Sequence, residues 1–167
     1  MPDMLSVYVR TPEIEDRQFP GHYENYPIEG ESNVNTVGTL VERTSRLMML
    51  VKLLALKLPS AANVLKAFTV KLLGVAQPIR LSMVNTQGRE MTIHKKLSGP
   101  TGIAVYLCDS HSHWQRGSNE NMNGLMRQYL LKGTDLSIYR EEQVDAIADE
   151  INNRPRKDWG VRSPLTV

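Results

Sequence analysis

The sequence has few cysteines, few aromatic residues and little net charge, and each shortage narrows the class of protein. Cys108 is the single cysteine among 167 residues. No disulfide can therefore form within the chain, and a reducing compartment is the expected setting. The net charge of +2 is too small to indicate a polyanionic partner by itself. The hydrophobic fraction of 41% is typical of a globular protein of one domain.

Long hydrophobic runs are also missing. Residues 47–58 are the most apolar stretch, but Lys52 and Lys57 interrupt it. It is also about half as long as a membrane-spanning helix must be. The first residues lack the basic start and apolar centre of a signal peptide. We therefore expect a cytoplasmic protein without a membrane segment.

The spacing of apolar residues predicts strands that alternate with helices. The expected strands cover residues 21–30, 34–43, 47–54, 79–83 and 103–107. The expected helices cover residues 60–72, 88–97, 118–131 and 141–152. Strand 47–54 is nearly all apolar, so we expect it to be buried on both faces. Pro27 is awkward in a central strand because proline cannot donate to the ladder. This order predicts an α/β fold with a mixed five-stranded sheet flanked by helices.

The organisation along the chain follows from the same pattern. Residues 1–20 are polar and proline-containing and are expected to form an extended lead-in. Residues 21–155 contain all the predicted elements and form the expected core. Residues 156–167 are expected to be a basic C-terminal tail.

The most informative segment is residues 112–129, which read S-H-W-Q-R-G-S-N-E-N-M-N-G-L-M-R-Q-Y. Glu120 falls in the first turn of the predicted helix, with amide and basic side chains around it. A carboxylate there can hold a divalent metal, and its amide and basic neighbours can hold phosphates. The alternative from the residues alone is an ordinary solvated helix start, at which the helix dipole favours glutamate.

This segment resembles the S-P-W-Q-R-G-x-N-E-N-x-N-G-L-x-R-Q-Y signature of transposases in the insertion-sequence-thirty family. The resemblance extends over nearly the whole chain. Residues 9–22 are similar to the family's P-E-x-E-D-R-x-x-P-G-H, and residues 37–46 match V-G-T-L-V-E-R-T-S-R. Residues 152–157 match N-N-R-P-R-K, and residues 162–164 match the closing R-S/T-P.

The resemblance implies an RNase H-like integrase core and a bacterial DDE transposase. Members use two aspartates and a glutamate to bind two divalent metals, Mg²⁺ or Mn²⁺, which promote attack on a DNA phosphodiester. Glu120 matches the glutamate. Tyr26 stands where the family's G-H-W-E-G-D has its aspartate, and Thr86 stands where its D-x-G has the second. Both residues are neutral at pH 7 and poor ligands for Mg²⁺, so the sequence predicts a degenerate, inactive site.

The residues leave two other possible metal sites open. Glu24 lies two positions before Tyr26, on the same face of a strand, and Asp109 follows the last expected strand. With Glu120 these two carboxylates would make a substitute metal triad. Cys108, Asp109, His111 and His113 invite a zinc interpretation, but their spacing fits no common zinc pattern and a polar loop is the favoured alternative. His22 and His94 are isolated and are expected to be structural or exposed.

DNA is the partner that the resemblance implies, as transposon ends and as target. The candidate DNA-binding residues beside Glu120 are Trp114, Arg116, Asn119, Asn123 and Arg127. Other candidate phosphate contacts are Arg43, Arg46, Arg154, Arg156, Lys157 and Arg162. The family's helix-turn-helix region does not fit ahead of Gly21, so specific recognition of transposon ends is expected to be absent. The predicted function is a degenerate transposase catalytic domain in DNA transposition. The alternative is a non-catalytic remnant that binds DNA, a second copy of the chain or an intact transposase.

Overall fold

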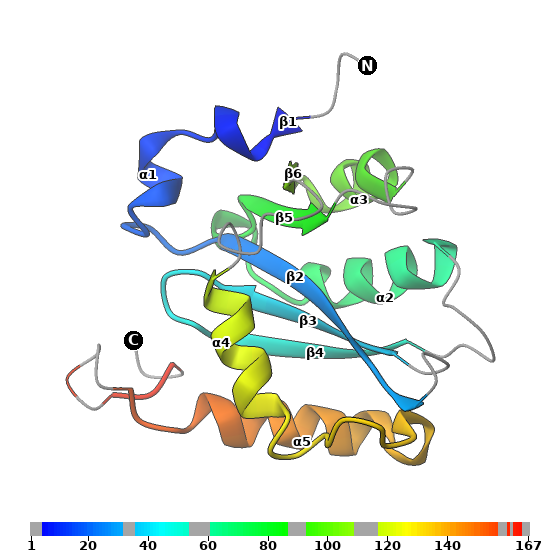
Figure 1. Ribbon diagram of the computed structural model, residues 1–167. Coiled ribbons are helices and arrows are strands. Elements are labelled where there is room, and N and C mark those ends of the chain that lie inside the picture. The colour runs from blue at the N-terminus through cyan, green and yellow to red at the C-terminus, as the bar shows by residue number, and fades with distance from the viewer. Residues whose placement is uncertain are drawn as a thin grey trace.

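The computed structural model describes residues 5–31, 36–53, 61–86, 93–108, 117–156, 160 and 162–164. These residues form a six-stranded mixed sheet with the strand order β1-β6-β5-β2-β3-β4 (Figure 1). Strands β2, β3 and β4 pair antiparallel, and β2-β5, β5-β6 and β6-β1 pair parallel. The strands are β1 (Leu5–Ser6), β2 (His22–Glu29), β3 (Thr36–Glu42), β4 (Met48–Leu53), β5 (Ser82–Thr86) and β6 (Ala104–Cys108).

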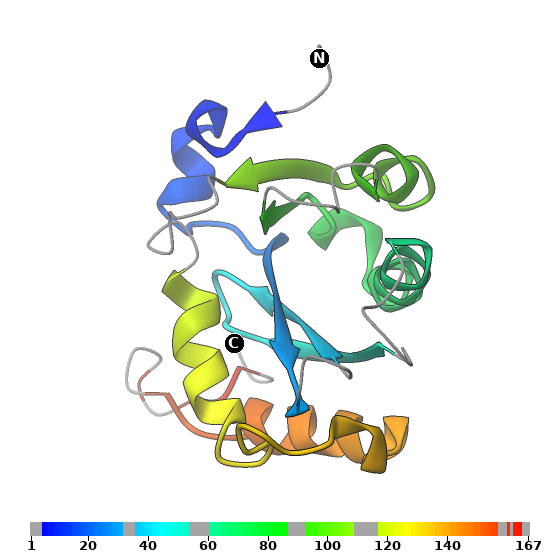
Figure 2. The same ribbon diagram turned by 45° about the vertical axis from the view of Figure 1, so that its right-hand side comes forward.

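Helices cover the two faces of this sheet. Helices α2 and α3 lie together on one face, α4 crosses the other, and α5 runs along the β4 edge (Figures 1 and 2). The α-helices are α1 (Pro12–Glu15), α2 (Ala61–Leu73), α3 (Ile93–Thr101), α4 (Gly117–Met126) and α5 (Glu141–Asn152). Short 3₁₀ helices cover Val7–Val9, Gln77–Ile79 and Leu136–Ile138. No helix within the described part of the chain combines the length and apolar character that a bilayer crossing requires.

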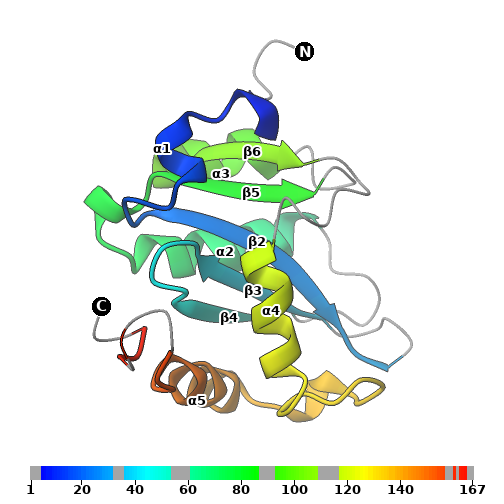
Figure 3. The same cartoon turned by 60° about the vertical axis from the view of Figure 1, so that its left-hand side comes forward.

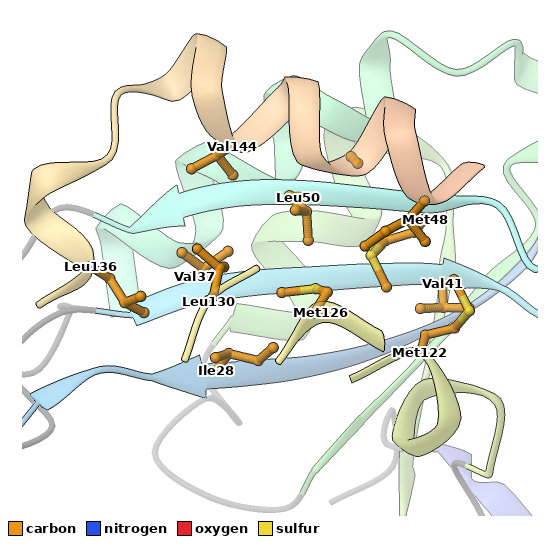
Figure 4. Packing of buried hydrophobic residues seen from close by; sticks show 12 residues of the cluster. Ile28, Val37, Val41, Met48, Leu50, Met122, Met126, Leu130, Leu136 and Val144 are labelled. Carbon is orange, nitrogen blue, oxygen red and sulfur yellow. The ribbon is translucent and has the colours of Figure 1, made fainter. Parts of the chain in front are cut away.

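The sheet separates two apolar cores. On one side Leu40, Phe68 and Met83 belong to a cluster that joins the sheet to α2. On the other side Ile28 and Met126 belong to a cluster that joins the sheet to α4 and α5 (Figure 4). Strand β3 lies between the two clusters and all seven of its residues are buried. Its apolar residues serve both cores, since Leu40 packs into the α2-side cluster and Val37 and Val41 into the α4-side cluster.

The expected architecture is confirmed, and the differences have local causes. The sheet has a sixth strand because the lead-in places Leu5 and Ser6 parallel to Tyr106 and Leu107. Strand β4 is buried on both faces, as predicted. Met48 and Leu50 pack into the α4-side core, and Val51 and Leu53 pack into the α2-side core. Met49 and Lys52 are only partly buried because β4 is the outer strand of the sheet.

The strand predicted at residues 79–83 begins later than expected. The Tyr23 hydroxyl donates to the Ile79 carbonyl at 2.9 Å, and Ile79 closes a 3₁₀ turn there. Strand β5 starts at Ser82, where the Gly21 carbonyl accepts from the Ser82 amide. Helix α3 is described from Ile93 and runs on to Thr101, beyond the predicted end at residue 97, while residues 88–92 of the predicted helix lie outside the described residues. Gly102 follows it with φ 70°, a backbone conformation that ends helices and favours glycine.

Pro27 lies within β2, a central strand, against the expectation. The His22 carbonyl accepts from Arg43 on the β3 side, whereas the Gly21 carbonyl accepts from Ser82 on the β5 side. Backbone groups alternate along a strand, so odd-numbered residues of β2 direct theirs towards β5. The pairing with β5 ends at Glu24 and Val84. The N–H that Pro27 lacks would therefore have had no strand partner, and the proline costs no ladder hydrogen bond.

The turn between β3 and β4 is organised by one buried carboxylate, that of Glu42. Its Oε2 accepts from the Ser45 amide at 2.6 Å, the Ser45 hydroxyl at 2.7 Å and the Thr44 amide at 3.1 Å. Its Oε1 accepts from the Gly21 amide at 3.1 Å. A buried carboxylate is stable only when hydrogen bonds replace its hydration. This part of the V-E-R-T-S-R segment is therefore a structural turn.

Asn152 closes the edge of the sheet. Its side-chain amide donates to the Met48 carbonyl at 2.7 Å, and its Oδ1 accepts from the Met48 amide at 2.8 Å. The side chain thus replaces a neighbouring strand at one residue of β4. This bond pair ties the last turn of α5 to the sheet and gives the first asparagine of N-N-R-P-R-K a structural role.

Gly38 in β3 predicts a clear loss of stability on substitution. A Cβ there would come within 2.7 Å of Cζ of Phe68, whose ring is buried in the α2-side core. We expect Gly38→Ala to lower the free energy of unfolding by about 1–3 kcal/mol, the usual penalty for overpacking a core. Urea unfolding measures it. In the matched control Gly99→Ala, a Cβ meets nothing within 4 Å in α3, and stability should stay level or rise. Equal effects in both variants would contradict the packing argument.

Candidate functional site

The positions of Tyr26 and Thr86 meet on neighbouring strands. Strands β2 and β5 pair Glu24 with Val84, and two residues further on lie Tyr26 and Thr86. The His22 ring and the Ser82 hydroxyl are 2.7 Å apart, so the even-numbered residues of both strands share a face. Ile28, which also has an even number, packs into the α4-side core. Positions 26 and 86 therefore belong to the face that α4 crosses; their side chains lie outside the described atoms.

Helix α4, which carries Glu120, packs against β2, the strand that carries Tyr26. Met122 and Met126 anchor the helix in the same core as Ile28 of β2, and Arg127 follows its last turn (Figure 4). The Arg127 guanidinium donates to the Glu29 carbonyl at the end of β2, at 3.3 Å. Figure 3 shows α4 crossing the sheet in front of β2. The elements that carry the three sequence-predicted positions are therefore neighbours, while the side chains of Tyr26, Thr86 and Glu120 lie outside the described atoms.

Glu24 is engaged elsewhere. Its carboxylate is fully buried, and Oε1 lies 3.0 Å from Nε of Arg43. Arg43, itself 5% exposed, also donates to the Ile14 carbonyl at 3.1 Å. A metal ion at Glu24 would have to displace a buried guanidinium. The expectation that Arg43 contacts DNA was wrong, because its guanidinium is buried in this pair.

The remaining predicted site residues differ in how much of each the structure describes. Arg127 contacts backbone carbonyls, those of Glu29 and Leu130. Asn123 is half-buried, and its Oδ1 has no hydrogen-bond partner within the described part of the chain. Asn119 belongs to α4 by its backbone, but its side chain is not described. Asp109, Trp114 and Arg116 lie outside the described residues, as do His111, His113 and Lys157.

Cys108 is buried at the end of β6, opposite Thr86 in the strand register and against Val84. Its three proposed zinc partners, Asp109, His111 and His113, lie outside the described ranges. Among the side chains that the structure does describe, no three His, Cys, Asp or Glu residues gather as a metal site would require.

His22 is structural, as one of the two sequence interpretations had it. It is buried beside Ser82 and helps to join the starts of β2 and β5. Burial lowers the pKa of its ring; Glu42 acts in the opposite sense, and Arg43 and Arg10 add to the lowering. The ring is therefore neutral at pH 7. His94 belongs to α3, and its side chain is not described.

Comparison with protein-family models gives no match. Curated proteins do match. The chain is 53% identical, over its full length, to a transposase for insertion sequence element IS1086 from Cupriavidus metallidurans. It is 37% identical over 96% of its length to transposase InsI for insertion sequence element IS30A from Escherichia coli K12. It is 28% identical over 95% of its length to a probable transposase for element IS1161 from Streptococcus salivarius.

The chain covers 48%, 41% and 44% of these three relatives, so it spans a little under half of their length. The strand order β6-β5-β2-β3-β4, with three antiparallel strands followed by two parallel ones, is that of an RNase H-like core. Sequence and fold agree. Over nearly its whole length the chain is therefore a homologue of the transposases of the insertion-sequence-thirty family.

Proposed function

We propose that this chain is a transposase catalytic core that retains the fold and the binding of DNA but has lost metal-dependent strand cleavage. The proposal rests on positions 26, 86 and 120, which supply a single carboxylate. Positions 26 and 86 lie on neighbouring strands, and this supports their belonging to one site. The similarity to transposases of insertion sequence elements supports the connection to transposition, and the strand register supports the identity of the site.

The donor set at these positions does not fit a pair of divalent metal ions. Mg²⁺ and Mn²⁺ prefer carboxylate oxygens, whereas tyrosine and threonine are neutral at pH 7. The candidate replacement Glu24 is already neutralised by Arg43 at 3.0 Å. Breaking a buried ion pair from one side costs free energy, so Glu24 is not expected to leave Arg43 and bind a metal ion. The substitute triad of Glu24, Asp109 and Glu120 is accordingly disfavoured.

Retention of DNA binding is the second half of the proposal. Arginines 46, 154 and 156 remain at least partly exposed, and Arg162 is exposed. Phosphate contacts of this kind do not require the metal-binding carboxylates. The proposal therefore separates binding from cleavage.

A nicking assay tests the proposed function directly. We expect the wild-type chain to leave supercoiled plasmid intact in Mg²⁺ and in Mn²⁺, at the level of a buffer control. Glu120→Gln should give the same background. Nicking that is clearly above background in the wild type and absent in Glu120→Gln would overturn the proposal and support the substitute triad.

A further inference from the structure

Four arginines from distant parts of the sequence converge on one side of the molecule. Arg46 lies in the turn between β3 and β4, whereas Arg154 and Arg156 follow α5. Arg162 joins them because the Arg156 amide donates to its carbonyl at 2.9 Å in an antiparallel bridge. Figures 1 and 3 show the C-terminal segment beside the β3–β4 turn. We call these four residues the arginine patch.

The patch is held against the helix that carries Glu120. A guanidinium nitrogen of Arg156 contacts Sδ of Met122 in α4 at 3.6 Å and also donates to the Ile151 carbonyl at 3.3 Å. Arg154 donates to Oε1 of Gln128 at 3.1 Å, and its guanidinium lies 5.3 Å from the ring centre of Tyr129. Such contacts fix the side chains in advance, so less conformational entropy is lost when a ligand binds.

The patch concentrates positive charge. Burial lowers the pKa of Arg156, and the proximity of Arg46 and Arg154 lowers it further. Arginine nevertheless stays charged at pH 7, so the like charges repel one another until an anion approaches. One nearby carboxylate, Glu150, accepts from the Tyr129 hydroxyl at 2.7 Å and offsets part of the charge. Guanidinium groups match the phosphate group in shape and in hydrogen-bond donors.

We propose that the arginine patch binds the sugar-phosphate backbone of duplex DNA alongside α4. The patch joins three motifs, V-E-R-T-S-R, N-N-R-P-R-K and R-S-P, into one surface outside the positions of the carboxylate triad. The choice of DNA over other polyanions rests on the proposed function. The patch explains how the chain can hold DNA without a metal ion.

The test is DNA binding in EDTA, which separates the patch from any cleavage. Fluorescence anisotropy with a labelled duplex of arbitrary sequence gives Kd between 50 and 200 mM salt, conditions in which phosphate contacts dominate. In the double variant Arg46→Gln/Arg162→Gln, we expect Kd to rise roughly tenfold or more. The slope of log Kd against log salt concentration should also fall by the amount expected for the loss of about two phosphate contacts. Arg154 and Arg156 stay unchanged because their contacts with Gln128, Tyr129 and Met122 hold the patch against α4 and the residues that follow it.

The matched control is Lys66→Gln/Lys96→Gln, which removes the same charge from exposed positions of α2 and α3 on the other face. It should bind DNA as the wild type does. The single variant Arg162→Lys, which keeps the charge, should stay close to wild type and guards against a folding defect. The proposed role of the patch would be overturned by any of three results. They are an equal rise of Kd in the lysine control, an unchanged salt dependence of Kd in the double arginine variant, and no binding of DNA by the wild type in EDTA. Nicking by the wild type would instead overturn the proposed function and leave the patch standing.

Discussion

Replacing Tyr26 and Thr86 together by aspartate is expected to create divalent-metal binding in this chain. Neighbouring strands are about 5 Å apart, so two carboxylates at these positions would share one site. Glu120, on the helix that packs against β2, would supply a third oxygen ligand. Calorimetric titration with Mn²⁺ should show saturable binding in Tyr26→Asp/Thr86→Asp and none in the wild type. The same variant should nick plasmid DNA, and Glu120→Gln in that background should abolish the nicking.

Stability supplies an independent measurement of the same site. Two carboxylates that share a site repel each other, so the double aspartate variant should have a lower Tm than the wild type without metal. Added Mn²⁺ should then raise its Tm, since a ligand that binds only the folded state stabilises it. In each single aspartate variant, Mn²⁺ should raise the Tm only slightly. A double variant whose Tm is unaffected by Mn²⁺ would show that positions 26 and 86 do not form a shared site.

The buried pair Glu24–Arg43 is expected to give one of the largest stability losses in the protein. Glu24→Gln leaves the Arg43 guanidinium buried without its anion, and Arg43→Met leaves the carboxylate without its cation. Breaking a buried pair from one side typically costs about 3–5 kcal/mol. Urea unfolding should show losses of this size for each single variant. The double variant should lose much less than the sum, because no uncompensated charge remains.

An exposed ion pair in the same chain is the control. Lys71 and Asp145 approach to 2.6 Å, but the Asp145 side chain is 46% exposed. Asp145→Asn should therefore cost less than about 1 kcal/mol. If Glu24→Gln were as mild as Asp145→Asn, the pair would not be a structural element. Glu24 would then return as a candidate metal ligand.

The strongest periodic patterns in the sequence predicted their elements closely. Helix α5 begins at Glu141 and ends at Asn152 as expected, because Val144, Ala148 and Ile151 recur at helical spacing on one face. Strand β3 ends at Glu42, within one residue of the prediction, since its valine, threonine and leucine residues favour a strand. In both cases local sequence and tertiary burial favour the same structure.

The polar interior could not be read from periodicity. Glu24, Glu42 and Asn152 are buried, yet nothing in their spacing separates them from exposed polar residues. Glu24 and Asn152 depend on partners 19 and 104 positions away, Arg43 and Met48, and Glu42 adds the distant Gly21 amide to its contacts within the turn. The family motifs did contain these residues, which was the available signal. Strand β1 was missed for a related reason, because two residues are too few to show a period.

The β4 edge of the sheet limits how this protein can associate. At the start of β4, Asn152 occupies the backbone groups of Met48. Exposed strand edges are the usual templates on which a further chain adds by main-chain pairing. Helix α5 also runs along this edge (Figure 1). A second copy of the chain is therefore expected to associate here through side chains of α5, and not by adding a strand to β4.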